Sequence, residues 1–174
     1  MRIAIDMDDT LLDTLGQLRQ WYAQRLGQGQ APQPEPGQHL VEAVPPAHRA
    51  QVQSWFDEPG FFRHLAFKPQ AREVLYALAQ RHEVYIATAA MEHPNSLRDK
   101  YDWLQQHLGF LGPDRWLFCG NKRVVQADLL IDDQPRHFAE FVGESWLFAA
   151  PHNTQVTGYP VVHNWAEVAA RLLN

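Results

Sequence analysis

The chain has 174 residues, of which 45% are hydrophobic and 20% charged, with a net charge of −5. These values predict one compact domain, or one domain with a modest insertion, and exclude disorder and fibrous repeats. The acidic balance argues against a nucleic-acid polymer as a partner, because proteins that bind its phosphates usually present a basic face. One cysteine, Cys119, excludes an internal disulfide and a thiolate-rich zinc site. No segment has the apolar length of a signal peptide or a membrane helix, so we expect a cytoplasmic protein with no membrane partner.

Short apolar runs alternate with segments of helical periodicity, which is the pattern of an α/β fold with a parallel sheet. Gly27 ends the first predicted helix, and Pro45, Pro46 and Pro69 open two later ones. In chain order the predicted elements are a strand at 2–5, a helix over 12–26, a loop at 28–38, helices at 45–56 and 69–79, a strand at 84–87, a helix over 96–108, strands at 116–119, 129–131, 146–149 and 161–163, and a helix over 165–173.

A long stretch without strands follows the first predicted strand. Residues 14–66 read as helices and loops, so we expect them to form a small helical cap above the sheet. Residues 1–13 and 67–174 then form the core domain. The sequence thus predicts an α/β fold of three layers, with a Rossmann-like parallel sheet and a small helical cap inserted after the first strand.

The segment that carries most chemistry is Asp6-Met7-Asp8-Asp9-Thr10, directly after the first predicted strand. Ligands of a parallel sheet bind beyond the carboxyl ends of its strands, and an extended backbone points side chains 6 and 8 to the same side. Two carboxylates that close need a cation, and Mg²⁺ prefers such oxygen ligands and attracts phosphate. Taken alone, an acidic pair of this kind is more often a turn of solvated acids.

Further polar residues occur where other predicted strands end. Asp132 and Asp133 follow one strand, Thr88 closes another with a hydroxyl, and Lys122 lies ten residues before Asp132. Separately, Thr88 reads as a strand-end cap and Lys122 as a surface charge. Together with the first acidic pair, they supply metal ligands, a donor to phosphate and a fixed cation.

This combination resembles the haloacid dehalogenase superfamily of phosphotransferases. The four motifs of that superfamily occur in the expected order, at Asp6-Met7-Asp8-Asp9-Thr10, Thr88, Lys122 and Asp132-Asp133. The resemblance implies a parallel sheet of the haloacid dehalogenase type. It also implies phosphoryl transfer rather than dehalogenation, because Asp8 supplies an acid for the leaving alkoxide.

A narrower resemblance is to the 5'(3')-deoxyribonucleotidase family, and it implies hydrolysis of deoxyribonucleoside monophosphates. It is carried by Glu58-Pro59-Gly60-Phe61-Phe62, Lys100-Tyr101-x-Trp103 and the stretch from Asn121 to Asp133. The chain also departs from that family, which commonly has Gly-Val at Asp9-Thr10, an aromatic residue at Thr14 and a serine at Ala89. The first departure leaves the chemistry intact, whereas the other two concern the substrate pocket.

The resemblance implies a role for each acidic residue. Asp6 is the nucleophile that forms an aspartyl phosphate. Asp8 is the general acid, and later the base that activates water. Mg²⁺ is held by Asp6, by the backbone carbonyl of Asp8 and by Asp133, while Asp132 orients the site from behind these ligands.

Phosphate and base contacts are expected from other residues. Thr88 and Lys122 hold phosphate oxygens. Lys100 is a further candidate for binding phosphate; the alternative is that it is an ordinary solvated residue on the surface of a helix. Phe61 and Phe62 are the best candidates for stacking on a nucleobase, although most aromatic residues of the cap should be packing residues. The nine histidines show no helical metal-ligand spacing, and we expect them at the surface.

The leading hypothesis is a Mg²⁺-dependent nucleotidase for a small nucleoside monophosphate. Its nearest rival is a phosphatase of the same superfamily that acts on a small sugar phosphate or another phosphorylated metabolite. A rival of another class is an inactive phosphate-binding or interaction protein, which the complete set of motifs argues against. Base preference and 5' or 3' position stay open. The sequence leaves the oligomeric state open, with a homodimer as one alternative.

Overall fold

The computed structural model describes residues 1–27, 29 and 31–174 of the chain. The strands are β1 (Arg2–Ile5), β2 (Glu83–Thr88), β3 (Trp116–Phe118), β4 (Leu129–Asp132), β5 (Glu144–Phe148) and β6 (Val161–Val162). The α-helices are α1 (Thr14–Leu26), α2 (Leu40–Ala43), α3 (Pro46–Ser54), α4 (Ala71–Ala79), α5 (Ser96–Leu108) and α6 (Trp165–Leu172). Short 3-10 turns include η1 (Trp55–Asp57), η4 (Lys122–Val124), η5 (Pro135–His137) and η6 (Pro151–Asn153).

The strands of the described residues form one parallel sheet in the order β3-β2-β1-β4-β5-β6. β1 lies near its centre, where Ile3 pairs with Val84 of β2 on one side and with Leu129 of β4 on the other. Residues 3–5 of β1 are fully buried, as expected for a strand that is covered on both faces. The predicted α/β class with a parallel sheet is confirmed.

Different kinds of structure cover the two faces of the sheet. Ile3 and Ile5 belong to a cluster that contains the buried side chains of α4, α5 and α6. Ala4 points the other way, since side chains alternate along a strand. It packs in a second cluster with Phe138 and Tyr159, which come from turns and loops. The layers are therefore helices, sheet, and a third layer built mainly of 3-10 turns and loops.

The sheet order changes direction between β1 and β4. The chain reaches β2 from β1 through α4 on the helical face, whereas it reaches β5 from β4 through η5 on the other face. In such a sheet, ligands bind at the carboxyl ends of the strands where these directions diverge. The backbone N–H of Asp6 donates to the carbonyl of Ile131 (2.9 Å) and holds the two strand ends together.

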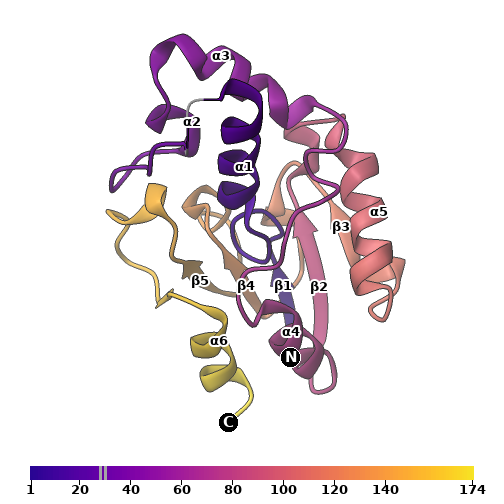
Figure 1. Ribbon diagram of the computed structural model, residues 1–174. Helices are drawn as coiled ribbons and strands as arrows, with labels where there is room; N and C mark the ends of the chain where they lie inside the picture. The colour runs from indigo at the N-terminus through magenta and orange to yellow at the C-terminus, as the bar shows by residue number, and fades with distance from the viewer. Residues whose placement is uncertain (28, 30) are drawn as a thin grey trace.

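The cap segment, residues 14–66, contains α1, α2, α3 and η1, and its described part holds no strand. In Figure 1 these helices stand above the edge of the sheet toward which the strands point. Tyr22 and Trp55 of this segment share one apolar cluster with Ile3 of the sheet. The division into core and cap domains stays a prediction, because the apolar packing runs across the boundary.

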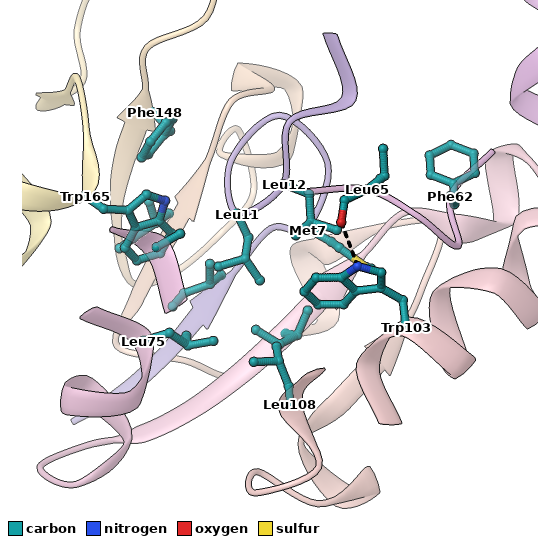
Figure 2. Packing of buried hydrophobic residues seen from close by; sticks show 14 of the residues in the cluster. Met7, Leu11, Leu12, Phe62, Leu65, Leu75, Trp103, Leu108, Phe148 and Trp165 are labelled. Carbon is teal, nitrogen blue, oxygen red and sulfur yellow. Dashed lines mark hydrogen bonds between the residues drawn. The ribbon is translucent and has the colours of Figure 1, made fainter. Parts of the chain in front are cut away.

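A buried hydrogen bond joins the cap segment to α5. The indole Nε1 of Trp103 donates to the backbone carbonyl of Leu65 (2.9 Å), as Figure 2 shows. The Trp103 side chain is almost completely buried, in the cluster that also holds Met7 and Leu12. The bond satisfies a carbonyl that would otherwise be buried without a partner.

The elements largely follow the sequence prediction, with local differences. The first helix begins at Thr14 rather than at Leu12, because the backbone N–H of Leu12 turns back to the carbonyl of Met7 and Asp13 caps the helix. The helix α2 was not predicted. In the predicted loop at 28–38, residues 28 and 30 lie outside the described residues, and the others form no helix or strand. None of the helices in the described part of the chain has the length and hydropathy needed to cross a membrane.

The Trp103→Phe variant should lower the free energy of unfolding by about 1–3 kcal/mol, because the Leu65 carbonyl loses its buried donor. Tyr101→Phe is the matched control on the same helix, since Tyr101 is 40% exposed and should change stability by less than about 0.5 kcal/mol. Urea unfolding followed by fluorescence measures both. Equal midpoints for the two variants would contradict this role for the Trp103–Leu65 bond.

Candidate active site

A cavity of about 640 Å³ opens beside the carboxyl ends of β1 and β4, between the sheet and the cap segment. Its walls combine acidic groups that follow β1 and β4, basic groups from α5 and η5, and aromatic and polar groups that include residues of the cap segment. The residues that line it include Asp6, Asp8, Asp9, Thr14, His39, Leu40, Val41, Glu42, Gln53, Phe56, Phe62, Ala89, Glu92, His93, Lys100, Asp133, Gln134, Arg136, His137 and His152.

Asp6 directly follows β1 at the floor of this cavity and is paired with a buried lysine. Lys122, which η4 carries and which is fully buried, contacts Asp6 Oδ1 and lies 2.5 Å from Asp132 Oδ2. The other oxygen of Asp132 accepts the backbone N–H of Gln134 (2.8 Å). Both oxygens of Asp132 thus have protein partners, which fits the orienting role expected of it.

Asp8 is paired with a second lysine, Lys100 of α5. The Lys100 ammonium contacts Asp8 Oδ2, donates to Thr88 Oγ1 (3.0 Å) and lies 4.4 Å from the ring centre of Phe62. The second oxygen, Asp8 Oδ1, is buried and has no hydrogen-bond partner among the described residues. An unpaired buried acceptor is costly, so this atom is suited to a proton or to a bound ligand.

Asp133 follows β4, and its backbone and side chain are both held. Asn153 Nδ2 donates to the Asp133 carbonyl (2.8 Å), and His152 Nε2 lies 3.1 Å from Asp133 Oδ2. Gln134 Nε2 also donates to Oδ2 (3.2 Å).

The carboxyl groups of Asp6 and Asp133 have raised pKa values. Burial raises the pKa of Asp6 well above its usual value, although the Lys122 ammonium opposes the change. Burial also raises the pKa of Asp133, against the effect of its hydrogen bond with His152. The pKa of Lys122, which burial alone would lower, is raised by the carboxylates of Asp132 and Asp6. The pKa of His152 rises as well, because the contact with Asp133 outweighs burial.

Asp6, Asp132 and Asp133 each offer a carboxylate oxygen, and these oxygens lie within 4.8 Å of one another. Hard divalent cations prefer clustered oxygen ligands. Of these groups, Asp6 and Asp133 line the cavity, whereas Asp132 is occupied by Lys122 and Gln134. The donor set therefore fits a divalent cation that Asp6 and Asp133 hold from the cavity side.

Asp9 occupies the position where the resembling family commonly has glycine, and its backbone explains why. Its φ is 55°, in the left-handed region that glycine adopts easily and aspartate tolerates. Asp9 Oδ1 accepts the N–H of Leu15 (3.2 Å), and the N–H of Asp9 donates to Thr14 Oγ1 (3.3 Å). Burial raises the pKa of Asp9 to about 7. Thr14 thus braces this turn, at the position where the resembling family was expected to have an aromatic residue.

The two aromatic residues expected at the base differ in position. Phe62 lines the cavity above Lys100, whereas Phe61 does not line it. Phe61 is fully buried among Trp21, Phe56 and Phe62, with ring centres 5.0–5.1 Å away. Phe61 therefore serves as packing behind the cavity wall in this structure.

Phe56 and His93, which stack at 5.4 Å, line the cavity on the same side as Phe62. The turn before Phe62 is fixed by α5, since Asp99 accepts the N–H of Gly60 (2.5 Å) and a bond from Arg63 Nε (3.0 Å).

His39, His93, His137 and His152 line the cavity. His39 is exposed, as expected, whereas His137 is only 7% exposed, so the surface position expected of it is wrong. The sequence holds one signal for some of these histidines, since His93, His137 and His152 each lie within five residues of the end of a strand that leads to the site.

The three residues expected to bind phosphate differ in position. Lys122 and Thr88 are buried and do not line the cavity, whereas Lys100, the lesser phosphate candidate, lines it.

Comparisons of the sequence agree on one family. The family model described as 5' nucleotidase, deoxy (pyrimidine), cytosolic type C protein matches residues 1–173. A relative from Staphylococcus aureus strain Mu50, provisionally named a 5'(3')-deoxyribonucleotidase, is 42% identical over 172 residues, or 99% of this chain and 95% of its own. The 5'(3')-deoxyribonucleotidase of Bacillus subtilis is 37% identical over 112 residues, or 64% of this chain and 65% of its own.

Solved structures share the fold at low identity. A haloacid dehalogenase family hydrolase from Deinococcus radiodurans, with bound phosphate and sodium, has a TM-score of 0.64 at 15% identity over 98% of this chain and 94% of its own. A haloacid dehalogenase-like family protein from Streptococcus pneumoniae has a TM-score of 0.58 at 14% identity over 98% and 97% of the two chains. The fold is that of haloacid dehalogenase-like proteins, and the chain belongs to the 5' nucleotidase, deoxy (pyrimidine), cytosolic type C family of phosphoric monoester hydrolases.

Proposed function

We propose that this enzyme hydrolyses deoxyribonucleoside monophosphates to deoxynucleoside and phosphate, with Mg²⁺ as cofactor and an aspartyl phosphate on Asp6 as intermediate. The observation that carries the proposal is that one cavity has the carboxylates Asp6 and Asp8 at its floor and the rings of Phe56 and Phe62 in its wall. Such a cavity suits a ligand with a charged phosphate at one end and a flat aromatic group at the other.

In the first step, an oxygen of Asp6 attacks phosphorus in line, and the bond from phosphorus to the nucleoside oxygen breaks. Asp8 gives its proton to the departing alkoxide, from the oxygen that does not contact Lys100. Lys122 holds Asp6 Oδ1, so the other oxygen of Asp6 is the one free to act as nucleophile. The product of this step is the nucleoside, with phosphate bonded to Asp6.

In the second step, water attacks the phosphorus of the aspartyl phosphate. Asp8 takes a proton from this water, and the bond between phosphorus and the Asp6 oxygen breaks. Thr88, Lys100 and Lys122 lie around the two carboxylates that react. Their donors offset the negative charge that grows on the phosphate oxygens in each transition state.

The metal would be held by Asp6, by the backbone carbonyl of Asp8 and by Asp133. When bound, Mg²⁺ offsets the charge of the phosphate dianion and of the carboxylates that surround it. This need is electrostatic. Among the described residues, Lys100 contacts Asp8, Lys122 contacts Asp6 and Asp132, and His152 contacts Asp133, so carboxylates outnumber lysines at the floor of the cavity.

The expected partner of the enzyme is a small nucleotide rather than a nucleic-acid polymer, in keeping with the net charge of −5. We also propose a cytoplasmic location, which the description of the matching family as cytosolic supports. A homodimer stays a prediction.

The Asp6→Asn variant should lose turnover by on the order of 10³-fold or more, because an amide oxygen is a poor nucleophile. Asp114→Asn, at an exposed aspartate, is the matched control and should retain wild-type activity. Phosphate release from dUMP measures both variants, with circular dichroism to verify that they are folded. Turnover of Asp6→Asn within tenfold of wild type would refute this role for Asp6.

Removal of divalent cations with EDTA should abolish activity, and added Mg²⁺ should restore it, whereas Ca²⁺ should restore little because it prefers more ligands. Since the pKa values of Asp6 and Asp133 are raised, protons must leave before the cation binds. The Mg²⁺ concentration for half-maximal activity should therefore fall as the pH rises. Mg²⁺ titrations at several pH values test this, and undiminished activity in EDTA would exclude the metal scheme.

The value of kcat/KM for dUMP should exceed that for UMP by about tenfold or more, because a 2'-hydroxyl without a partner in an apolar pocket costs about 1–3 kcal/mol. A panel of nucleoside monophosphates and sugar phosphates, scored by phosphate release, measures this. Phe62→Leu should raise KM for dUMP more than KM for para-nitrophenyl phosphate. Equal kcat/KM for dUMP and UMP would reject the deoxyribose preference, and faster turnover of a sugar phosphate would favour the rival phosphatase.

A further inference from the structure

The side chain of Asp133 is held from one side. Hydrogen-bond donors reach its oxygen Oδ2, where His152 Nε2 lies at 3.1 Å and Gln134 Nε2 at 3.2 Å. No hydrogen bond to Oδ1 occurs within the described residues. The carboxylate is therefore fixed through one oxygen, and its other oxygen is left for a ligand in the cavity that Asp133 lines.

The environment of His152 determines which group donates. Its Nε2 lies near Asp133 Oδ2 (3.1 Å), the Asp133 carbonyl (3.2 Å) and Gln134 Nε2 (3.0 Å). The first two atoms can only accept, so the proton belongs on His152 Nε2 and the Gln134 amide turns its own hydrogen to Asp133. One ring thus touches both the backbone and the side chain of the same aspartate.

A second histidine covers the ring of His152. His39, just before α2 in the cap segment, stacks on it with ring centres 4.7 Å apart and an angle of 8° between the rings. Near-parallel stacking restricts rotation of the His152 ring, and it brings the two rings together in the wall of the cavity.

Backbone contacts hold His39 in this place. The N–H of Gly37 donates to the carbonyl of Pro151 (2.8 Å), one residue before His152. Gly37 has a φ of 90°, a backbone conformation that favours glycine. The segment 37–39 and the turn η6 are thus joined both by backbone and by side chains.

We propose that His152 is a positioning residue that orients the Asp133 carboxylate toward the metal. Because His39 stacks on His152, this orientation also depends on the packing of segment 37–39 against η6. The inference rests on the metal site of the proposed function. Partners behind a metal ligand fix its orientation, and their loss typically weakens metal binding by about 10- to 100-fold.

Direct binding of Mg²⁺ tests the proposal without substrate. The whole protein is freed of metal with EDTA and then titrated with MgCl₂ in a calorimeter, and the Mg²⁺-induced rise in Tm provides a second readout. His152→Ala should weaken Mg²⁺ binding by about tenfold or more. His152→Gln should recover most of the loss, because its amide can donate to Asp133. His163→Ala, at an exposed histidine, is the matched control and should bind Mg²⁺ like wild type.

Variants of His39 test the stack separately. His39→Phe keeps a flat ring and should bind Mg²⁺ like wild type, whereas His39→Ala should weaken binding a few-fold. If His152→Ala fails to fold, His152→Gln and the His39 pair still decide the question. Wild-type Mg²⁺ affinity in folded His152→Ala, or no recovery in folded His152→Gln, would overturn the proposal.

The Asp133→Asn variant distinguishes this proposal from the one on which it rests. It should lose most Mg²⁺ binding, because an amide oxygen replaces a carboxylate ligand. Wild-type binding in Asp133→Asn would instead refute the metal site itself.

Discussion

Carboxylates crowd the junction where β1 and β4 end, and the rest of the structure depends on how their repulsion is offset. The sheet order brings the two strand ends together, and the Asp6–Ile131 backbone bond keeps them in register. Buried like charges destabilise a fold unless cations share the same volume. Lys100 and Lys122 supply part of the compensation. The two lysines do not offset all of the carboxylate charge. The remaining repulsion destabilises the fold, and the same repulsion favours the binding of a further cation.

The lysines also connect the layers of the molecule to the site. Lys122 comes from the layer of turns and Lys100 from the helical layer, so the end of β1 is contacted from both faces of the sheet. The helix α5 has a double role, because Lys100 contacts Asp8 while its neighbour Asp99 holds the turn before Phe62. One helix therefore contacts both the acidic floor of the cavity, through Lys100, and the turn that carries its aromatic wall, through Asp99. These contacts help to fix the distance between the floor and the wall.

The sequence predicted the parts that follow from local pattern and from the rule for parallel sheets. Acidic residues directly after strands needed only that rule to be brought to one edge. Phe61 and Phe62 could not be told apart, because adjacent residues in a turn point in directions that tertiary packing decides. His152 follows β5 by four residues, but its position near a strand end does not by itself distinguish a site residue from a surface histidine. The helix α2 has four residues, too few to show a period.

The thin layer of turns over one face of the sheet has a consequence for how the molecule fluctuates. A helix shares its hydrogen bonds along a cooperative ladder, whereas η4 and η5 are closed by isolated bonds. Local opening is easiest where such cooperativity is low. Backbone amides around Lys122 should therefore exchange with solvent faster than those of α4 or α5. Lys122 contacts both Asp6 and Asp132. Each such opening would therefore remove the positive charge beside these two carboxylates while the helical layer of the protein stays folded.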